Sequence, residues 1–99
     1  MIQLARVAAK EGAQRGIRVN AIAPGGVDTP LWDTMPFFRQ LAEEHGGHAA
    51  AIEAMAKAGT PLGFYAEPDE IAAQIAFLLS DAAKSITGSV LTVDGGYTL

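Results

Sequence analysis

The sequence contains no cysteine, which excludes a disulfide scaffold, a thiolate nucleophile and a cysteine-based zinc site. It has no cluster of Lys or Arg, and its formal net charge of −4 argues against a nucleic-acid partner. No apolar run approaches the roughly 20 residues that cross a bilayer, so we expect no membrane partner. The first residues lack a charged leader followed by a long apolar stretch, which predicts a cytoplasmic protein rather than a secreted one.

What the sequence does contain is typical of a globular chain. Hydrophobic residues make up 49% of the 99 residues and charged residues 18%, a balance that argues against disorder. The length allows at most one small domain. Alanine accounts for 19 of the hydrophobic residues, so large core-forming side chains are scarcer than the overall fraction indicates.

The chain begins with a predicted helix and a predicted strand. Apolar and small residues at helical spacing predict a helix over residues 2–14, with Gly16 as its stop. The β-branched segment 17–23 predicts a strand that is mostly covered on both faces. On such a strand the polar side chains of Arg18 and Asn20 need hydrogen-bond partners.

The middle of the chain, residues 30–63, is broken repeatedly by Gly and Pro. Short helices are predicted over residues 36–45 and 48–58, on either side of Gly46-Gly47. Two short helices between such breaks indicate a flap or lid rather than part of a core.

A clear helix and a second strand follow. Pro68 opens the helix and two acidic residues follow in its first turn, as suits the helix dipole. Residues 90–93 predict a strand, and residues 94–96 a tight turn. A strand, a long helical connection and a second strand predict a parallel βαβ unit. The buried stripe of the helix is expected to comprise Ile71, Ile75, Leu78 and Leu79.

These elements do not make a complete fold. A parallel strand that is apolar on both faces requires neighbouring strands and covering helices, and a two-stranded parallel sheet is a poor fold by itself. The 17–23 strand also has an edge that another segment must cover. We therefore predict an α/β fold that is the C-terminal portion of a doubly wound, Rossmann-like parallel sheet. Residues 1–99 form part of one domain, with residues 30–63 as its substrate lid.

Motifs in a fixed order along the whole chain carry a resemblance to a family. They are R-V-N-A-I-A-P-G-G-V-D-T (18–29), P-L-G (61–63), E-P-D-E-I-A (67–72), F-L-L-S-D (77–81), I-T-G (86–88) and V-D-G-G (93–96). This set resembles short-chain dehydrogenases/reductases, and most closely 3-oxoacyl-carrier-protein reductases and sugar or alcohol dehydrogenases. The resemblance implies NAD or NADP as cofactor, and hydride transfer to or from a small carbonyl or alcohol substrate.

The turn after the 17–23 strand is the candidate cofactor site. Ligands of doubly wound sheets bind beyond the carboxyl ends of the strands, and glycine lets a backbone approach a ligand closely. The resemblance implies that backbone groups near Val27 meet the nicotinamide carboxamide and that the Thr29 hydroxyl meets the carboxamide or pyrophosphate. Alternatively, Thr29 caps a helix that begins with proline. The candidate cofactor-binding residues are Pro24, Gly25, Gly26, Val27 and Thr29.

Four apolar residues of the middle segment are candidate lid residues. They are Trp32, Met35, Phe37 and Phe38. In one interpretation they form an apolar wall that closes over the substrate. In the other they pack onto the neighbouring helices or form an oligomer contact.

The two histidines, His45 and His48, do not predict a metal site. Gly46-Gly47 between them breaks the helical geometry, and two histidines leave a tetrahedral site incomplete. We expect solvated loop histidines and no metal.

No catalytic residue is identifiable in the sequence. The Gly-rich dinucleotide turn, the catalytic Ser and the Tyr-x-x-x-Lys pair of the family are absent from residues 1–99. The resemblance implies that Met1 follows shortly after the position of the catalytic Lys. We expect the isolated chain to be inactive and not to bind NADH or NADPH. In the full-length context it supplies part of the nicotinamide site, the lid and oligomer surfaces, with helix 2–14 as half of a homo-oligomer contact.

A second hypothesis is a non-enzymatic remnant or interaction module. The open edge of the 17–23 strand motivates it, because an uncovered edge pairs with another chain. Such a module is stabilised by self-association, and cofactor binding and association state distinguish it from an oxidoreductase.

Overall fold

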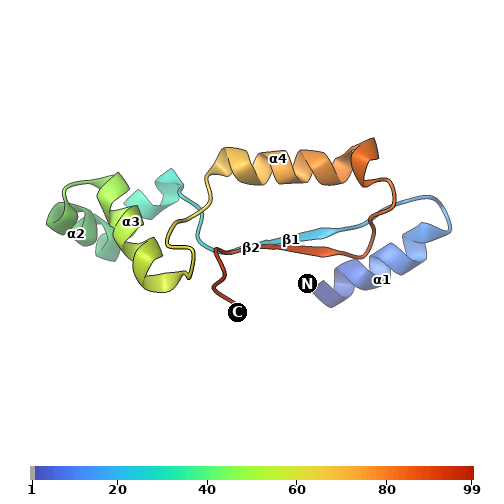
Figure 1. Ribbon diagram of the computed structural model, residues 1–99, viewed down its shortest axis with the longest axis horizontal. Coiled ribbons are helices and arrows are strands. Elements are labelled where there is room, and N and C mark those ends of the chain that lie inside the picture. Colours follow the sequence, from blue (N-terminus) through green and yellow to red (C-terminus); the bar gives the residue numbers. More distant parts are fainter. Residues whose placement is uncertain (1) are drawn as a thin grey trace.

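The computed structural model describes residues 2–99 (Figure 1). The elements are α1 (Ile2–Ala13), β1 (Ala21–Pro24), the 3-10 helix η1 (Pro30–Thr34), α2 (Pro36–His45), α3 (His48–Gly59), α4 (Pro68–Leu79), the 3-10 helix η2 (Asp81–Ala83) and β2 (Val90–Val93). The four predicted helices and the second strand are therefore confirmed. Within residues 2–99, no helix has the length and apolar character needed to cross a membrane.

The two strands form a parallel sheet, with Ala21 opposite Val90 and Pro24 opposite Val93. The predicted parallel βαβ pairing is confirmed. In Figure 1, α4 lies over one face of the sheet, and α1 lies on the opposite side near the amino ends of the strands. Helices α2 and α3 lie beyond the carboxyl ends, so the loop after β1 leads directly towards them.

Strand β1 begins at Ala21, later than the predicted start of the strand. In the preceding residues, hydrogen bonds that involve side chains accompany a backbone bond, from the Gly88 N–H to the Val19 carbonyl at 2.8 Å. Arg18 Nη1 donates to a carbonyl in the last turn of α4 at 2.8 Å and to the carbonyl of Ile86 at 3.2 Å. Asn20 Nδ2 donates to the same Ile86 carbonyl at 3.0 Å, and Asn20 Oδ1 accepts from the Ser89 N–H at 3.0 Å. The partners that Arg18 and Asn20 require are therefore present.

The middle segment, residues 30–63, contains a hydrophobic core of its own. Phe38 of α2 is the largest fully buried side chain among residues 2–99, and it packs with Ala51 and Ile52 of α3. Its two helices bury apolar surface against each other, so the segment has an interior separate from the sheet, and its role as a lid stays a prediction. Half-buried side chains around this core are Trp32, Met35, Leu41, Ala42, Met55 and Tyr65.

The turn between α2 and α3 consists of Gly46 and Gly47, as the sequence predicts. Their φ angles are 97° and 137°, a region that favours glycine. The N–H groups of both glycines donate to the Ala42 carbonyl, at 2.9 and 2.8 Å, and so satisfy the end of α2. Nothing lies within 4 Å of the place where a side chain would begin at either glycine.

The predicted buried stripe of α4 is wrong for this chain, because no residue of α4 is buried. Ile75 is 45% exposed and Leu79 is 78% exposed. Strand β1 is likewise only partly covered. The physical reason is that a sheet of two strands is too narrow to cover a helix of this length. A groove of about 410 Å³ remains between α4 and β1, lined in part by Ile22 and Leu78.

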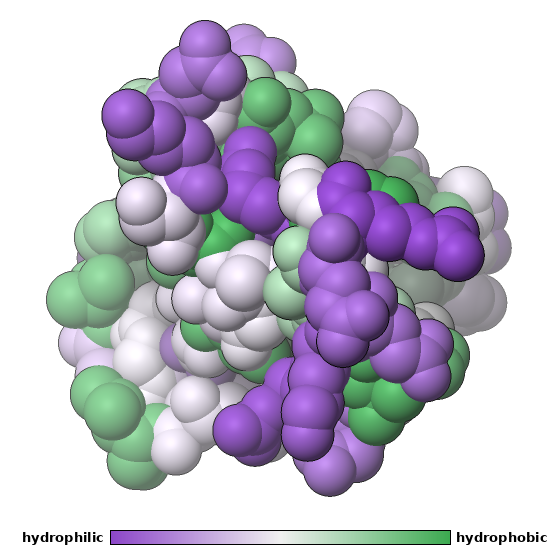
Figure 2. Space-filling model, turned by 90° about the vertical axis from the view of Figure 1, so that its right-hand side faces the viewer, coloured by the Kyte–Doolittle hydropathy of each residue, from purple (hydrophilic) through white to green (hydrophobic). Residues whose placement is uncertain are grey.

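Apolar residues of α1 are also exposed. Ile2, Leu4 and Val7 all lie on the surface. Figure 2 views the end of the molecule that is on the right of Figure 1, and it shows hydrophobic patches in green between hydrophilic side chains. The predicted fold class is confirmed in both respects: the chain has parallel α/β elements, and its faces are those of a partial domain.

Candidate functional site

The loop that follows β1 is shaped by two close contacts within the chain. A Cβ at Gly25 would lie 2.7 Å from Cβ of Asp94, which follows β2. A Cβ at Gly26 would lie 2.5 Å from a ring carbon of Tyr65. Such separations are below any ordinary contact distance, so neither position accepts a side chain without displacement of its neighbour. Glycine at these two positions therefore leaves room for Asp94 and Tyr65 of the same chain. The sequence pattern does not reveal this reason for the two glycines.

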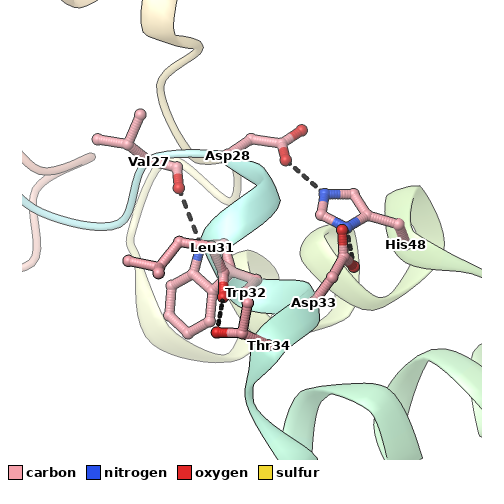
Figure 3. A network of polar contacts seen from close by, with 7 residues as sticks. All are labelled: Val27, Asp28, Leu31, Trp32, Asp33, Thr34 and His48. Carbon is pink, nitrogen blue, oxygen red and sulfur yellow. Dashed lines mark hydrogen bonds and ion pairs between the residues drawn. The ribbon is translucent and has the colours of Figure 1, made fainter.

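Val27 is held on one side by a side chain and on the other by a backbone bridge. Trp32 Nε1 donates to the Val27 carbonyl at 2.9 Å (Figure 3). The neighbouring Asp28 N–H donates to the Ala66 carbonyl at 2.9 Å, beside an isolated parallel bridge between Val27 and Ala66. Among residues 2–99, the N–H of Val27 has no hydrogen-bond acceptor. The Val27 N–H is thus a free donor on a backbone that is fixed on both sides.

Thr29 precedes η1, whose first residue is Pro30. Its backbone is extended, with φ −130° and ψ 159°, as in a helix cap, but its side chain makes no capping hydrogen bond. Thr29 therefore occupies the N-cap position of the alternative interpretation, but without a side-chain capping bond. Its hydroxyl is left for other partners.

Aromatic rings pack together around Trp32. Tyr65 is stacked on Trp32 with ring centroids 6.2 Å apart, and Phe38 and Phe37 lie at 5.9 and 6.3 Å. Phe38 is buried, whereas Phe37 is 58% exposed and Met35 is half-buried. Phe38 therefore packs inside the segment, and Phe37 presents its ring to solvent. Tyr65 was not among the predicted site residues, because no motif marks a tyrosine that covers a glycine.

His48 contacts two carboxylates, which corrects its interpretation as a solvated loop residue. His48 Nε2 lies 2.7 Å from Asp28 Oδ1, and His48 Nδ1 lies 2.7 Å from Asp33 Oδ1 (Figure 3). The hydrogen bonds to Asp28 and then to Asp33 raise the pKa of His48 above its usual 6.5. His48 is the first residue of α3, so it joins that helix to the loop after β1 and to η1.

These residues surround an open hollow of about 420 Å³. Among its lining residues are Thr29, the His48 ring and a third carboxylate, Glu67, which precedes α4. The hollow lies beside the loop at the carboxyl end of β1, where parallel sheets bind ligands. Among residues 2–99, no group of three or more His, Cys, Asp or Glu side chains is arranged to hold a metal ion.

The turn after β2 is closed by Asp94, as predicted for a tight turn. Its Oδ1 accepts from the Gly96 N–H at 2.9 Å, and its Oδ2 accepts from the Thr98 hydroxyl at 2.8 Å. The bond from Thr98, assisted by backbone N–H groups, lowers the pKa of Asp94 below its usual 3.8. The turn is therefore stabilised above pH 3.8, and this stabilisation is lost as the pH falls through the lowered pKa.

Comparison with known proteins decides the family. The family model described as enoyl-(acyl carrier protein) reductase matches residues 1–98. The chain belongs to the short-chain dehydrogenase/reductase family. The family resemblance inferred from the ordered motifs is thereby confirmed.

Individual members of the short-chain dehydrogenase/reductase family match nearly the whole chain. Cis-4-hydroxycyclohexanecarboxylate dehydrogenase of Sinomonas cyclohexanicum is 46% identical over 96% of this chain and 33% of its own length. L-sorbose reductase of Gluconobacter frateurii, solved with NADPH and L-sorbose, is 32% identical with a TM-score of 0.82, covering 97% of this chain and 36% of that one. 4-Hydroxyisoleucine dehydrogenase, solved with NADH, is 32% identical with a TM-score of 0.71, covering 98% and 34%. The chain spans about a third of the length of these family members.

Proposed function

We propose that this chain forms the nicotinamide-side loop and the substrate lid of an NAD(P)-dependent oxidoreductase that acts on a small alcohol or carbonyl compound. The observation that carries the proposal is the loop after β1, whose backbone is fixed by Trp32 and Ala66 while the Val27 N–H and the Thr29 hydroxyl remain free. Related proteins that hold NADPH or NADH support the choice of cofactor.

The residues of this loop fit a nicotinamide cofactor. The Val27 N–H is a free donor for the carboxamide oxygen, and the Thr29 hydroxyl can bond the carboxamide or the pyrophosphate. Pro24, Gly25 and Gly26 set the path of the backbone that presents these groups. The cofactor, when bound, supplies or accepts the hydride. The groups that move the proton are proposed to come from the two thirds of the domain that this chain does not span.

The segment 30–63 is proposed as the substrate lid. Trp32, Met35 and Phe37 provide its apolar surface, and buried Phe38 supports them from inside. Its attachment just beyond the Thr29 loop brings it next to the place where the nicotinamide would lie. Whether the substrate is a sugar alcohol, a cyclic hydroxy acid or another small alcohol depends on the surface of this segment.

Self-association through α1 and a cytoplasmic location are further parts of this proposal. Exposed Ile2, Leu4 and Val7 favour the first, because a helix with such a face buries it against another helix. A location in the cytoplasm fits a chain without cysteine.

The alternative function, a non-enzymatic interaction module, is favoured by one observation: the open groove between α4 and β1. The coding DNA upstream of the Met1 codon distinguishes the two functions. An in-frame Tyr-x-x-x-Lys motif a few codons upstream supports the oxidoreductase, whereas a stop codon or unrelated sequence there supports the interaction module.

The test of the cofactor loop uses a completed domain. We define this as the present chain fused to the part of cis-4-hydroxycyclohexanecarboxylate dehydrogenase that it does not cover. Thr29→Val should weaken NAD(P)H binding about tenfold, because one hydrogen bond to the cofactor is lost. The matched control is Thr34→Val at the end of η1, since the Thr34 hydroxyl donates to the Leu31 carbonyl at 2.7 Å. Equal dissociation constants for the two variants and the parent would refute the role of Thr29.

A further inference from the structure

The His48 ring contacts a carboxylate through each of its nitrogens, and this arrangement favours the protonated ring. Carboxylates at neutral pH only accept hydrogen bonds, so each 2.7 Å contact requires an N–H on the ring. A neutral imidazole has one N–H and would place a lone pair against one carboxylate. The geometry is therefore that of an imidazolium.

The charged groups around the ring determine whether the neutral imidazole or the imidazolium is favoured. Asp28 from the loop, Asp33 from η1 and Glu67 from the segment before α4 all line the hollow beside it. Helix α2 packs the Phe38 ring against the imidazole, with centroids 5.2 Å apart. The amino end of α3 itself disfavours a positive charge, so the carboxylates must outweigh the helix dipole.

The other charged side chains nearby in sequence do not offset the carboxylates. On α3, Glu53 and Lys57 pair with each other at 2.7 Å. Arg39 of α2 makes no ion pair within residues 2–99. Within residues 2–99, His48 is the basic side chain that forms ion pairs with Asp28 and Asp33.

We propose that His48 is a positioning residue whose imidazolium ties the first turn of α3 to the Asp28–Thr29 loop, and so holds the lid and the cofactor loop together. This inference rests on the proposed function. Three segments meet at the one ring: Asp28 lies next to both Val27 and Thr29, Asp33 lies next to Trp32, and His48 begins α3 (Figure 3). Loss of the proton releases one contact and leaves uncompensated negative charge beside the site for the anionic cofactor.

The pH dependence has a definite sign. The pKa of His48 is raised in the folded chain, so its contribution to stability is complete below 6.5, the unfolded value. That contribution is lost as the pH rises through the folded pKa. Cofactor binding that depends on the contacts of His48 with Asp28 and Asp33 should weaken over the same pH interval.

The first experiment is a histidine NMR titration of both the 99-residue chain and the completed domain. His48 is assigned by the loss of its signal in His48→Gln. We expect the pKa of His48 to lie above 6.5, and Asp28→Asn or Asp33→Asn to lower it. A His48 pKa at or below 6.5 overturns the proposal.

The second experiment measures the dissociation constant of NADPH and NADH for the completed domain across the same pH range. We expect binding to weaken about threefold or more as His48 loses its proton, and this pH dependence to be absent in His48→Gln. The control His45→Gln should keep the profile of the parent. The same profile in His48→Gln as in the parent overturns the role given to His48. Absence of NAD(P)H binding at every pH overturns the proposed function instead, and the NMR titration still reports whether His48 is held by Asp28 and Asp33.

Discussion

A single glycine, Gly26, illustrates how the cofactor loop depends on contacts inside the chain. The ring of Tyr65 lies where a side chain at position 26 would begin, and the same ring is stacked on Trp32. A substitution at position 26 therefore acts on Trp32 through Tyr65. The loop and the aromatic group that holds it are one packing unit.

We predict that Gly26→Ala displaces the Tyr65 ring and lowers the free energy of unfolding of the completed domain by about 1–3 kcal/mol, the usual cost of overpacking. Denaturant unfolding measures the free energy, and the emission of Trp32, the only tryptophan of this chain, reports the local displacement. The matched control is Gly59→Ala at the end of α3, where nothing lies within 4 Å. Equal stability of the two variants would contradict the contact with Tyr65.

For single residues, the sequence predicts which residues belong to the candidate site better than it predicts the contacts that those residues make. The resemblance marked Val27 and Thr29, and the structure leaves both with a free hydrogen-bonding group. The partners of His48 were not predicted, because Asp28 and Asp33 lie 20 and 15 residues earlier in the chain. Only the packing of η1 and α3 against α2 brings these carboxylates to the ring.

Among the elements, η1, α2 and α3 form the part of the chain with the best-defined interior. The two adjacent phenylalanines of α2 separate its interior from its surface, because Phe38 is 0% exposed and Phe37 is 58% exposed. One ring supports the helices, and the other faces the solvent beside Trp32. This contrast allows the packing and the proposed lid role to be tested separately.

We predict that Phe38→Ala lowers the free energy of unfolding of the completed domain by about 3–5 kcal/mol, through lost burial and a residual cavity. Phe37→Ala should change it by less than about 1 kcal/mol and should instead raise KM for the substrate. Denaturant unfolding and steady-state kinetics provide the two measurements. A large stability loss in Phe37→Ala, or an unchanged KM, would argue against the lid.

Predictions at the element scale succeeded where the signal is local. Gly16 and Gly46-Gly47 end helices through their own backbone conformations, and the helix after Pro68 begins as its first turn predicts. The start of β1 and the burial of α4 were wrong, because both depend on neighbours in space. Arg18 and Asn20 bond to carbonyls of other segments before β1 begins, and Ile75 and Leu79 stay 45% and 78% exposed.

The whole molecule is more extended than a complete domain of its length. Its radius of gyration is 16.8 Å, whereas a compact domain of this length has about 13 Å. Its accessible surface is 6852 Å², against roughly 5,400 Å² for a compact chain of this mass. The excess includes the apolar faces of α1, α4 and β1, which the rest of a Rossmann-like sheet would cover.

We predict that the 99-residue chain associates with itself in solution, because its exposed apolar faces are removed from water on association. Light scattering at increasing concentration measures the mass. The double variant Ile75→Lys and Leu79→Lys, which places charges in the groove beside β1, should reduce association. Gln40→Lys, at an exposed position of α2, adds a charge outside the groove and should not. A monomeric parent chain would show that these faces do not drive association.

Because the α2–α3 unit buries Phe38 among its own residues, it has a degree of evolutionary independence from the sheet. Its outer surface and the open Gly46-Gly47 turn can change in sequence or length while the strands and the loop after β1 keep their packing. In the proposed function, a change in this unit would therefore alter the surface offered to the substrate and leave the loop after β1 unchanged.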